Sequence, residues 1–332
     1  MTSLLQVEDL SVAFHTPRGL VHAVQGVSYR LEAGETLAVV GESGSGKSVH
    51  ALAIAGLLPQ ANARILGGTV RFAGQTLPAQ QSNQWTSIRG RQIGFVFQDP
   101  MTALNPLLTI GRQLAAPLRR HFTLDARALR RRCIELLERV GIAQAEQRLK
   151  HFPHQFSGGM RQRVLIAMAI AANPRLLIAD EATTALDVTV QAQILDLINE
   201  LKRDLDLTVI WISHDLGVVA RLADTVQVMY AGQIVERGPV DALFHDPRHA
   251  YTLGLLRSVP HPGTERLRAI GGQPPDLANL PAGDPFAPRN PYATARCFQQ
   301  RPPLLPASQG AAGHCVAAWY DLPAILAAEG GI

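Results

Sequence analysis

Eight consecutive residues have the types and spacing needed to hold phosphate groups: Gly41, Glu42, Ser43, Gly44, Ser45, Gly46, Lys47 and Ser48. An apolar run at 36–40 precedes them, and an apolar helical stretch at 49–58 follows. Glycine lets the backbone take positive φ and turn its N–H groups inward, and the helix directs the positive end of its dipole at the phosphates. Lys47 can reach the β- and γ-phosphates, and Ser48 offers a hydroxyl to Mg²⁺. The loop predicts binding of a nucleoside triphosphate, and a Gly/Ser turn without a ligand is the alternative.

Two adjacent carboxylates end a second apolar run. Asp180 and Glu181 follow the buried-strand pattern at 176–179, which places them at the strand's carboxyl end, where α/β sheets bind ligands. Asp180 would hold Mg²⁺ through water, and Glu181 would polarise the attacking water as general base. A strand that ends in two acids by chance is the alternative.

A third motif, Ser157-Gly158-Gly159, precedes the apolar helical stretch at 164–172. A hydroxyl, two bare backbones and a helix N-terminus make a second phosphate-binding surface, yet one chain needs only one γ-phosphate cradle. A head-to-tail dimer explains both, because this surface would then close over the nucleotide held by the partner. An ordinary N-capped helix is the alternative.

The elements that must position these motifs form an α/β pattern. Apolar runs at 36–40, 93–97, 175–179 and 207–212 predict central strands, and alternating segments at 4–14 and 21–31 predict an antiparallel edge sheet. Residues 105–155 contain no such strand and have helical periodicity at 110–119 and 126–140. The pattern predicts an α/β core interrupted by helices.

With Gln98 in 95–100, Ala185-Leu186-Asp187 and His214 in 212–215, all the motifs stand in the order of one family. The chain resembles the ATPase subunits of ABC transporters over about its first 258 residues. The resemblance implies a P-loop (RecA-like) ATPase domain at 1–258 with an antiparallel edge sheet and an inserted helical subdomain at about 100–155.

The resemblance also implies roles for single residues. Gln98 would contact Mg²⁺ and the attacking water, and the segment 98–108 would meet the membrane subunits. Asp187 would lie at the dimer seam, and His214 would contact the γ-phosphate as a switch. Phe14 resembles the aromatic residue that stacks on adenine, with a place in the strand core as the alternative.

Two positions depart from the family pattern. Ala182 stands where proline usually follows the catalytic glutamate, which loosens φ and restores a backbone N–H. Phe156, directly before the Ser157 motif, stands where leucine is usual, which changes packing volume more than polarity. The chemistry needs no proline at position 182, so we expect activity to survive.

Length, composition and charge narrow the classes of protein to which the chain can belong. A chain of 332 residues with 47% hydrophobic content can bury a full core, and no apolar run approaches the roughly 20 residues of a membrane-spanning helix. The amino terminus lacks signal-peptide character, so a cytoplasmic protein is expected. The formal charge is +4, and the arginine runs at 119–120 and 130–132 fit a solvated helix face better than a nucleic-acid site.

Twelve of the 22 prolines lie after residue 258, so an irregular extension at 259–332 is expected that does not extend the core. A simple linker is the alternative. The segments 230–238, 245–252, 255–260 and 288–293 resemble the ATPases of dipeptide, oligopeptide and nickel importers.

Relatives of that type often bind an iron–sulfur cluster through four cysteines in this extension. The matching positions here are Asp284, Asn290, Cys297 and Cys315, which leaves two of the four thiolates normally needed. A cluster is therefore not expected, and the two cysteines are expected as free thiols. Cys133 lies in a helical pattern elsewhere and should pack as a small apolar residue.

The resemblance implies an ATPase subunit that binds ATP and Mg²⁺ and powers peptide uptake from the cytoplasmic face of the inner membrane, as a peripheral protein. Its expected partners are two membrane-spanning permease subunits, a second and different ATPase subunit, and indirectly an external solute-binding protein. No nucleic acid is expected. Nickel or a glutathione-like solute remains open as cargo, and a soluble ABC ATPase of DNA repair or translation and a P-loop kinase are the rivals from other classes.

Overall fold

The computed structural model describes residues 3–17, 19–80, 82–184, 186–259 and 269–329. The chain divides into two compact units. The first comprises Met1–Glu32, Leu37–Gln80 and Ser213–Ile332, and the second comprises Ala33–Thr36 and Gln81–Ile212.

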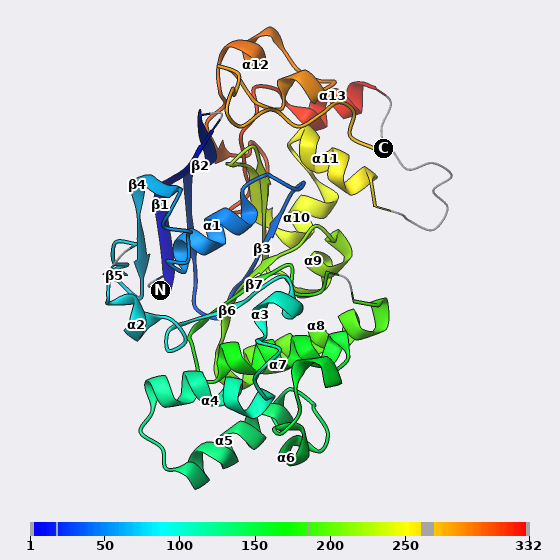
Figure 1. Ribbon diagram of the computed structural model, residues 1–332. Coiled ribbons are helices and arrows are strands. Elements are labelled where there is room, and N and C mark those ends of the chain that lie inside the picture. The colour runs from blue at the N-terminus through cyan, green and yellow to red at the C-terminus, as the bar shows by residue number, and fades with distance from the viewer. Residues whose placement is uncertain (1–2, 18, 81, 185, 260–268, 330–332) are drawn as a thin grey trace. The chain divides into compact units, whose positions relative to one another are not determined.

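An antiparallel sheet opens the first unit (Figure 1). Its strands, in the order β2-β1-β4-β5, are Gly19–Leu31, Leu5–Thr16, Ala63–Phe72 and Gln75–Thr76. Val7, Leu10 and Val12 of β1 are buried. Alternate side chains of a strand face the core, and the register shift between Val7 and Leu10 moves the buried positions from odd to even numbers. The antiparallel sheet expected at 4–14 and 21–31 is confirmed.

Parallel pairing builds the core of the first unit. Strand β3 (Thr36–Val40) runs parallel to β9 (Thr225–Tyr230), which pairs antiparallel with β10 (Gln233–Pro239). All five residues of β3 are buried, as the continuous apolar run requires. The helices of this part are α1 (Lys47–Ile54), α9 (Leu216–Leu222), α10 (Val240–His245) and α11 (Ala250–Arg257).

The carboxyl-terminal extension belongs to the same core. Its elements are η2 (Ala287–Arg289), α12 (Ala295–Gln299), β11 (Leu305–Pro306), β12 (Cys315–Val316) and α13 (Leu322–Ala328). Strand β12 pairs antiparallel with β10, and Phe286, only 1% exposed, joins the core cluster of Tyr230 and Tyr251. The expectation that the tail does not extend the core is wrong. Proline prevents long helices and strands, but the short elements between prolines still bury aromatic side chains.

Three parallel strands form the sheet of the second unit. They are β8 (Thr208–Ile212), β7 (Leu176–Asp180) and β6 (Ile93–Val96), with β7 between the other two. Every residue of β7 and β8 is buried. The strands expected at 93–97, 175–179 and 207–212 are confirmed, as is the one at 36–40.

Helices make up the rest of the second unit (Figure 1). They are α2 (Trp85–Ile88), α3 (Pro100–Ala103), α4 (Ile110–His121), α5 (Ala126–Arg139), α6 (Ala145–Arg148), η1 (Pro153–Gln155), α7 (Gly158–Ile170) and α8 (Val188–Leu205). The helices expected at 110–119 and 126–140 are confirmed.

The apolar faces of α4 and α5 bury Leu114 and Leu118 on one helix and Cys133 and Leu137 on the other. Cys133 packs as the sequence predicts. The arginines at 119–120 and 130–131 are exposed, as a solvated face requires, and the one at 132 is half-buried. Within the described ranges, no helix combines the length and apolar character needed to cross a bilayer.

Candidate nucleotide-binding site

The glycine loop at 41–48 joins β3 to α1 in the first unit. Gly41 has φ +147 and Gly46 has φ +101, conformations that side-chain-bearing residues rarely adopt. A Cβ on Gly41 would overlap the carbonyl oxygen of Met229, and one on Gly46 would overlap that of Ala23. Both positions therefore need glycine for φ and for the close approach of neighbouring backbone.

Lys47 closes the loop on itself. Its side chain is buried, and its Nζ donates to the carbonyl oxygens of Gly41 (2.8 Å) and Glu42 (2.9 Å). The hydroxyl of Ser45 is buried without a hydrogen-bond partner in the part of the chain that the structure describes, and Ser48 follows Lys47 on α1. A buried cation, an unsatisfied hydroxyl and a helix N-terminus are suited to an incoming polyphosphate.

Helix α1 is anchored behind the loop by a buried polar pair. The Nε2 atom of His50 and the hydroxyl of Tyr29 lie 2.8 Å apart. Burial lowers the pKa of His50 to about 4, so the imidazole is neutral at physiological pH.

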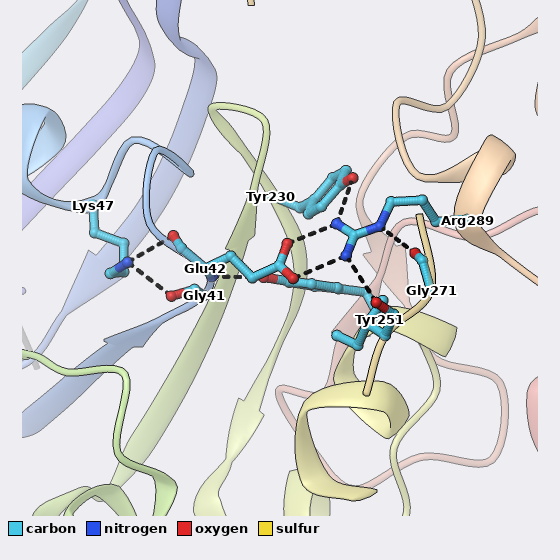
Figure 2. A network of polar contacts seen from close by, with 8 residues as sticks. Gly41, Glu42, Lys47, Tyr230, Tyr251, Gly271 and Arg289 are labelled. Carbon is cyan, nitrogen blue, oxygen red and sulfur yellow. Dashed lines mark hydrogen bonds and ion pairs between the residues drawn. The ribbon is translucent and has the colours of Figure 1, made fainter. Parts of the chain in front are cut away.

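Glu42 belongs to a network that sequence spacing did not reveal (Figure 2). Its backbone N–H donates to the Tyr251 hydroxyl (2.7 Å), and its carboxylate accepts from both terminal nitrogens of Arg289 (2.7 and 2.9 Å). Burial raises the pKa of Tyr251, which keeps its hydroxyl protonated. Arg289 lies 247 positions from Glu42, so no local signal could have connected them.

The carboxylate pair lies in the second unit, at the end of β7. Asp180 is the last residue of the strand and is 7% exposed. Glu181 takes the left-handed conformation with φ +46, and its N–H donates to the carbonyl oxygen of Ile212 (3.1 Å). Positive φ is costly for a residue other than glycine, and such strain clusters at functional sites.

Gln98 and Glu181 are brought together by the fold of the second unit. The Gln98 Nε2 donates to Glu181 Oε2 (2.9 Å), and the Thr184 hydroxyl donates to the same oxygen at 3.3 Å. The carboxylate is therefore oriented by two neutral donors. The contact of Thr184 was not predicted from the sequence, although this residue lies only three positions after Glu181.

The Ser157 motif and Asp187 lie side by side in the second unit. Ser157 caps α7 and accepts from Met160 N–H (3.3 Å), and Asp187 caps α8. A Cβ on Gly159 would lie 2.5 Å from Val190 on the first turn of α8, so the two helix starts touch. Ser157 and Asp187 are both exposed, and Ala185 lies outside the described residues.

His214 and Phe14 lie in the first unit. His214 is exposed and precedes α9, whose cap Asp215 accepts from Gly217 N–H (2.8 Å). Phe14 is half-buried on β1 and is paired with Val21 on β2. Its contact with adenine stays a prediction.

The four positions matched to cluster cysteines do not suit an iron–sulfur cluster. Cys297 is buried beside Asp284, whose N–H donates to the Cys297 carbonyl oxygen (2.8 Å). Asp284 Oδ1 accepts from Phe286 N–H, and burial raises the pKa of this carboxyl to about 6. Cys315 lies on β12. The carboxyl group of Asp284 and the amide of Asn290 stand where two of the four thiolates that such clusters require would be.

A glycine loop at the start of a helix, a strand ending in Asp-Glu and a Ser-Gly-Gly helix start define a P-loop ATPase of the ABC type. Two family models match the chain, "ABC transporter" over residues 24–184 and "Oligopeptide/dipeptide transporter, C-terminal region" over 235–297.

Curated relatives match nearly the whole chain. The oligopeptide transport ATP-binding protein OppD of Bacillus subtilis is 52% identical over 326 residues, 97% of this chain and 90% of the relative. The dipeptide transport ATP-binding protein DppD of Lactococcus lactis is 49% identical over 308 residues, 92% of this chain and 88% of the relative. The chain therefore belongs to the ABC transporter family, in its oligopeptide/dipeptide branch, and it is an ATPase.

A solved structure shares the fold of the ATPase part. The dimeric ATP-binding cassette MJ0796, in a post-hydrolysis state with ADP and Pi, has a TM-score of 0.64 and 27% identity. The match covers 71% of this chain and 98% of the cassette. The predicted family, fold class and ATPase activity are confirmed.

Proposed function

We propose that this chain hydrolyses ATP to power peptide uptake through a membrane importer. The observation that carries the proposal is the extent of the similarity to OppD, which covers 97% of the chain. ATPase cores are common to many transporters, whereas the match to the oligopeptide/dipeptide C-terminal region reaches into the extension. Peptides are therefore favoured as the solute.

Within the site, Glu181 is proposed as the general base. Its carboxylate accepts from Gln98 at 2.9 Å, and a carboxylate oriented in this way is suited to take a proton from the attacking water. Ser48, Asp180 and Gln98 supply the hard oxygen donors that suit Mg²⁺, a cation that needs only one or two protein ligands beside phosphate and water. When bound, Mg²⁺ neutralises charge on the β- and γ-phosphates.

A head-to-tail dimer is proposed to complete the site. Ser157 and Asp187 are exposed at two adjoining helix starts, and a helix N-terminus favours phosphate oxygens. These groups, with Gly158 and Gly159, would face the nucleotide held by a second and different ATPase subunit. His214, exposed at the start of α9, would contact the γ-phosphate, and Phe14 would stack on adenine.

An exposed apolar segment supports attachment to membrane subunits. Met101 is 59% exposed and Leu107 is 82% exposed, both within 98–108. Large apolar side chains exposed within one short segment indicate an interaction surface. We propose that through this segment the chain attaches to two permease subunits at the cytoplasmic face of the inner membrane. An external solute-binding protein would deliver the peptide on the opposite side.

Reconstitution tests the proposal. The chain is co-expressed with the permease and ATPase subunits encoded beside it, and the complex is placed in liposomes with the solute-binding protein and labelled peptides. Peptide uptake that requires ATP is the expected result. Uptake of nickel or a glutathione-like solute instead would refute the peptide assignment and leave the ATPase intact.

Two substitutions test the membrane contact. Leu107→Glu should abolish co-purification with the permeases, because a buried unpaired carboxylate costs several kcal/mol, on the order of 3 or more. Leu305→Glu is the matched control, since Leu305 is 54% exposed in the extension. If both variants co-purify equally well, 98–108 is not the contact.

A further inference from the structure

The extension contacts the phosphate-binding loop through one arginine. Arg289 donates from Nη1 to Glu42 Oε2 (2.7 Å) and from Nη2 to Glu42 Oε1 (2.9 Å), a two-point ion pair that joins 259–332 to 41–48 (Figure 2). Such paired geometry fixes the direction of a carboxylate as well as its charge.

Arg289 is itself rigidly held. Its Nε donates to the carbonyl oxygen of Gly271 (2.8 Å), and Nη1 also donates to the Tyr230 hydroxyl (3.1 Å). The side chain is only 4% exposed, and hydrogen bonding to Glu42 raises the pKa of Arg289 above its ordinary high value. The cation therefore has a fixed position, and the loop carboxylate takes its position from it.

Every polar group of Glu42 is occupied. Its N–H is bound to Tyr251, its carbonyl oxygen to Lys47 and its carboxylate to Arg289. The extension also lines a cavity of about 120 Å³ with the loop, through Pro274 and Leu277. The loop is thus held from the side of the extension as well as by its own glycines.

A carboxylate in this loop is a liability for phosphate binding. A glutamate without its cation repels the negative phosphates, and it offers an acceptor to the ammonium of Lys47, which already donates to the Glu42 carbonyl oxygen at 2.9 Å. Both effects weaken nucleotide binding, and both disappear when a cation holds the carboxylate.

We propose that Arg289 is a positioning residue for nucleotide binding, which holds the Glu42 carboxylate so that it neither repels the phosphates nor binds Lys47. The extension would then set the ATP affinity of the loop. The inference requires ATP binding by this chain, and it holds whatever the solute, the membrane partners or the dimer arrangement.

A double-mutant cycle on the purified full chain tests the proposal. A fluorescent ATP analogue is titrated with Mg²⁺ against the wild type, Arg289→Ala, Glu42→Gln and the double variant. Arg289→Ala should weaken binding about tenfold in the wild-type background and less than about threefold in the Glu42→Gln background. If Arg289 acted only on folding, its replacement would weaken binding of the ATP analogue equally in both backgrounds, and that result would overturn the proposal.

Arg296→Ala is the matched control, because Arg296 stacks on Trp319 and contacts Gln300, both within the extension. It should bind the analogue as the wild type does. Arg289→Lys keeps the charge and loses the two-point geometry, so its loss should be smaller, about threefold, and again suppressed by Glu42→Gln. It replaces the alanine variant if that one does not fold. The proposal would also be refuted if Arg289→Ala bound the ATP analogue as tightly as the wild type, or if Arg289→Lys did so where the alanine variant does not fold.

Steady-state hydrolysis provides an independent readout. The defect of Arg289→Ala should appear as a raised KM for ATP with kcat nearly unchanged, because the loop's hold on the phosphates is weakened and the chemistry at Glu181 is not. A lowered kcat at unchanged KM would contradict the inference.

Discussion

Replacing Phe286 by alanine tests whether the extension is part of the core or a linker. Phe286 is 1% exposed, and its ring centroid lies 5.2 Å from that of Tyr230, 5.3 Å from Tyr251 and 5.6 Å from His249. Truncating a buried phenylalanine costs about 3–5 kcal/mol in free energy of unfolding. The cost at Phe286 should lie at the upper end of that range, because its ring has three aromatic neighbours and each favourable ring pair adds about 0.5–1.5 kcal/mol.

Urea unfolding followed by circular dichroism measures the effect. With a slope of about 3 kcal/mol per molar urea, a loss of that size lowers the midpoint by roughly 1 M or more. Phe298→Ala is the matched control, because Phe298 lies in the same extension and is 55% exposed. Its cost should stay near 0.5 kcal/mol, which moves the midpoint by about 0.2 M.

Equal midpoints for the two variants would refute the reasoning. They would mean that the extension behaves as a linker and that Phe286 does not pack on Tyr230 and Tyr251 in solution. An early, separate transition in Phe286→Ala would instead show that the extension unfolds as its own unit.

Three further predictions concern catalysis, pH and metal content. Glu181→Gln should lower hydrolysis by about 10²–10⁴-fold while leaving ATP binding, and ATP should trap it as a dimer in size-exclusion chromatography. Exposed Glu200→Gln on α8 is the control, and normal hydrolysis by Glu181→Gln would remove the base assignment. The folded pKa of Asp284 is about 6 against 3.8 for the free group, so its ionisation destabilises the fold as pH rises through that interval. Asp284→Asn should therefore gain stability relative to wild type between pH 4 and pH 7, by on the order of 2 kcal/mol, and a constant difference in thermal unfolding would contradict this. Cys297 and Cys315 should both be recovered as unmodified thiols by a thiol reagent added to the unfolded protein, and the native protein should show no iron–sulfur absorbance; stoichiometric iron and sulfide would show the opposite.

Much of the fold could be predicted because its signals are local. The strands at 36–40, 176–180 and 208–212 are continuous apolar runs, which parallel pairing buries on both faces. The loop at 41–48 depends on glycines whose φ freedom acts within a few residues. The contact between Gln98 and Glu181 spans 83 positions and was not predicted, because the family resemblance gave Gln98 a role toward Mg²⁺ and the attacking water, not toward Glu181.

The sequence by itself determined the strand–loop–helix that binds nucleotide, the order of the motifs and the family they define. The tertiary structure alone decided that a proline-rich tail completes the core through Phe286 and holds the loop through Arg289. The physical reason is that periodicity reports how a segment is exposed, whereas a contact across 247 positions depends on how segments pack together.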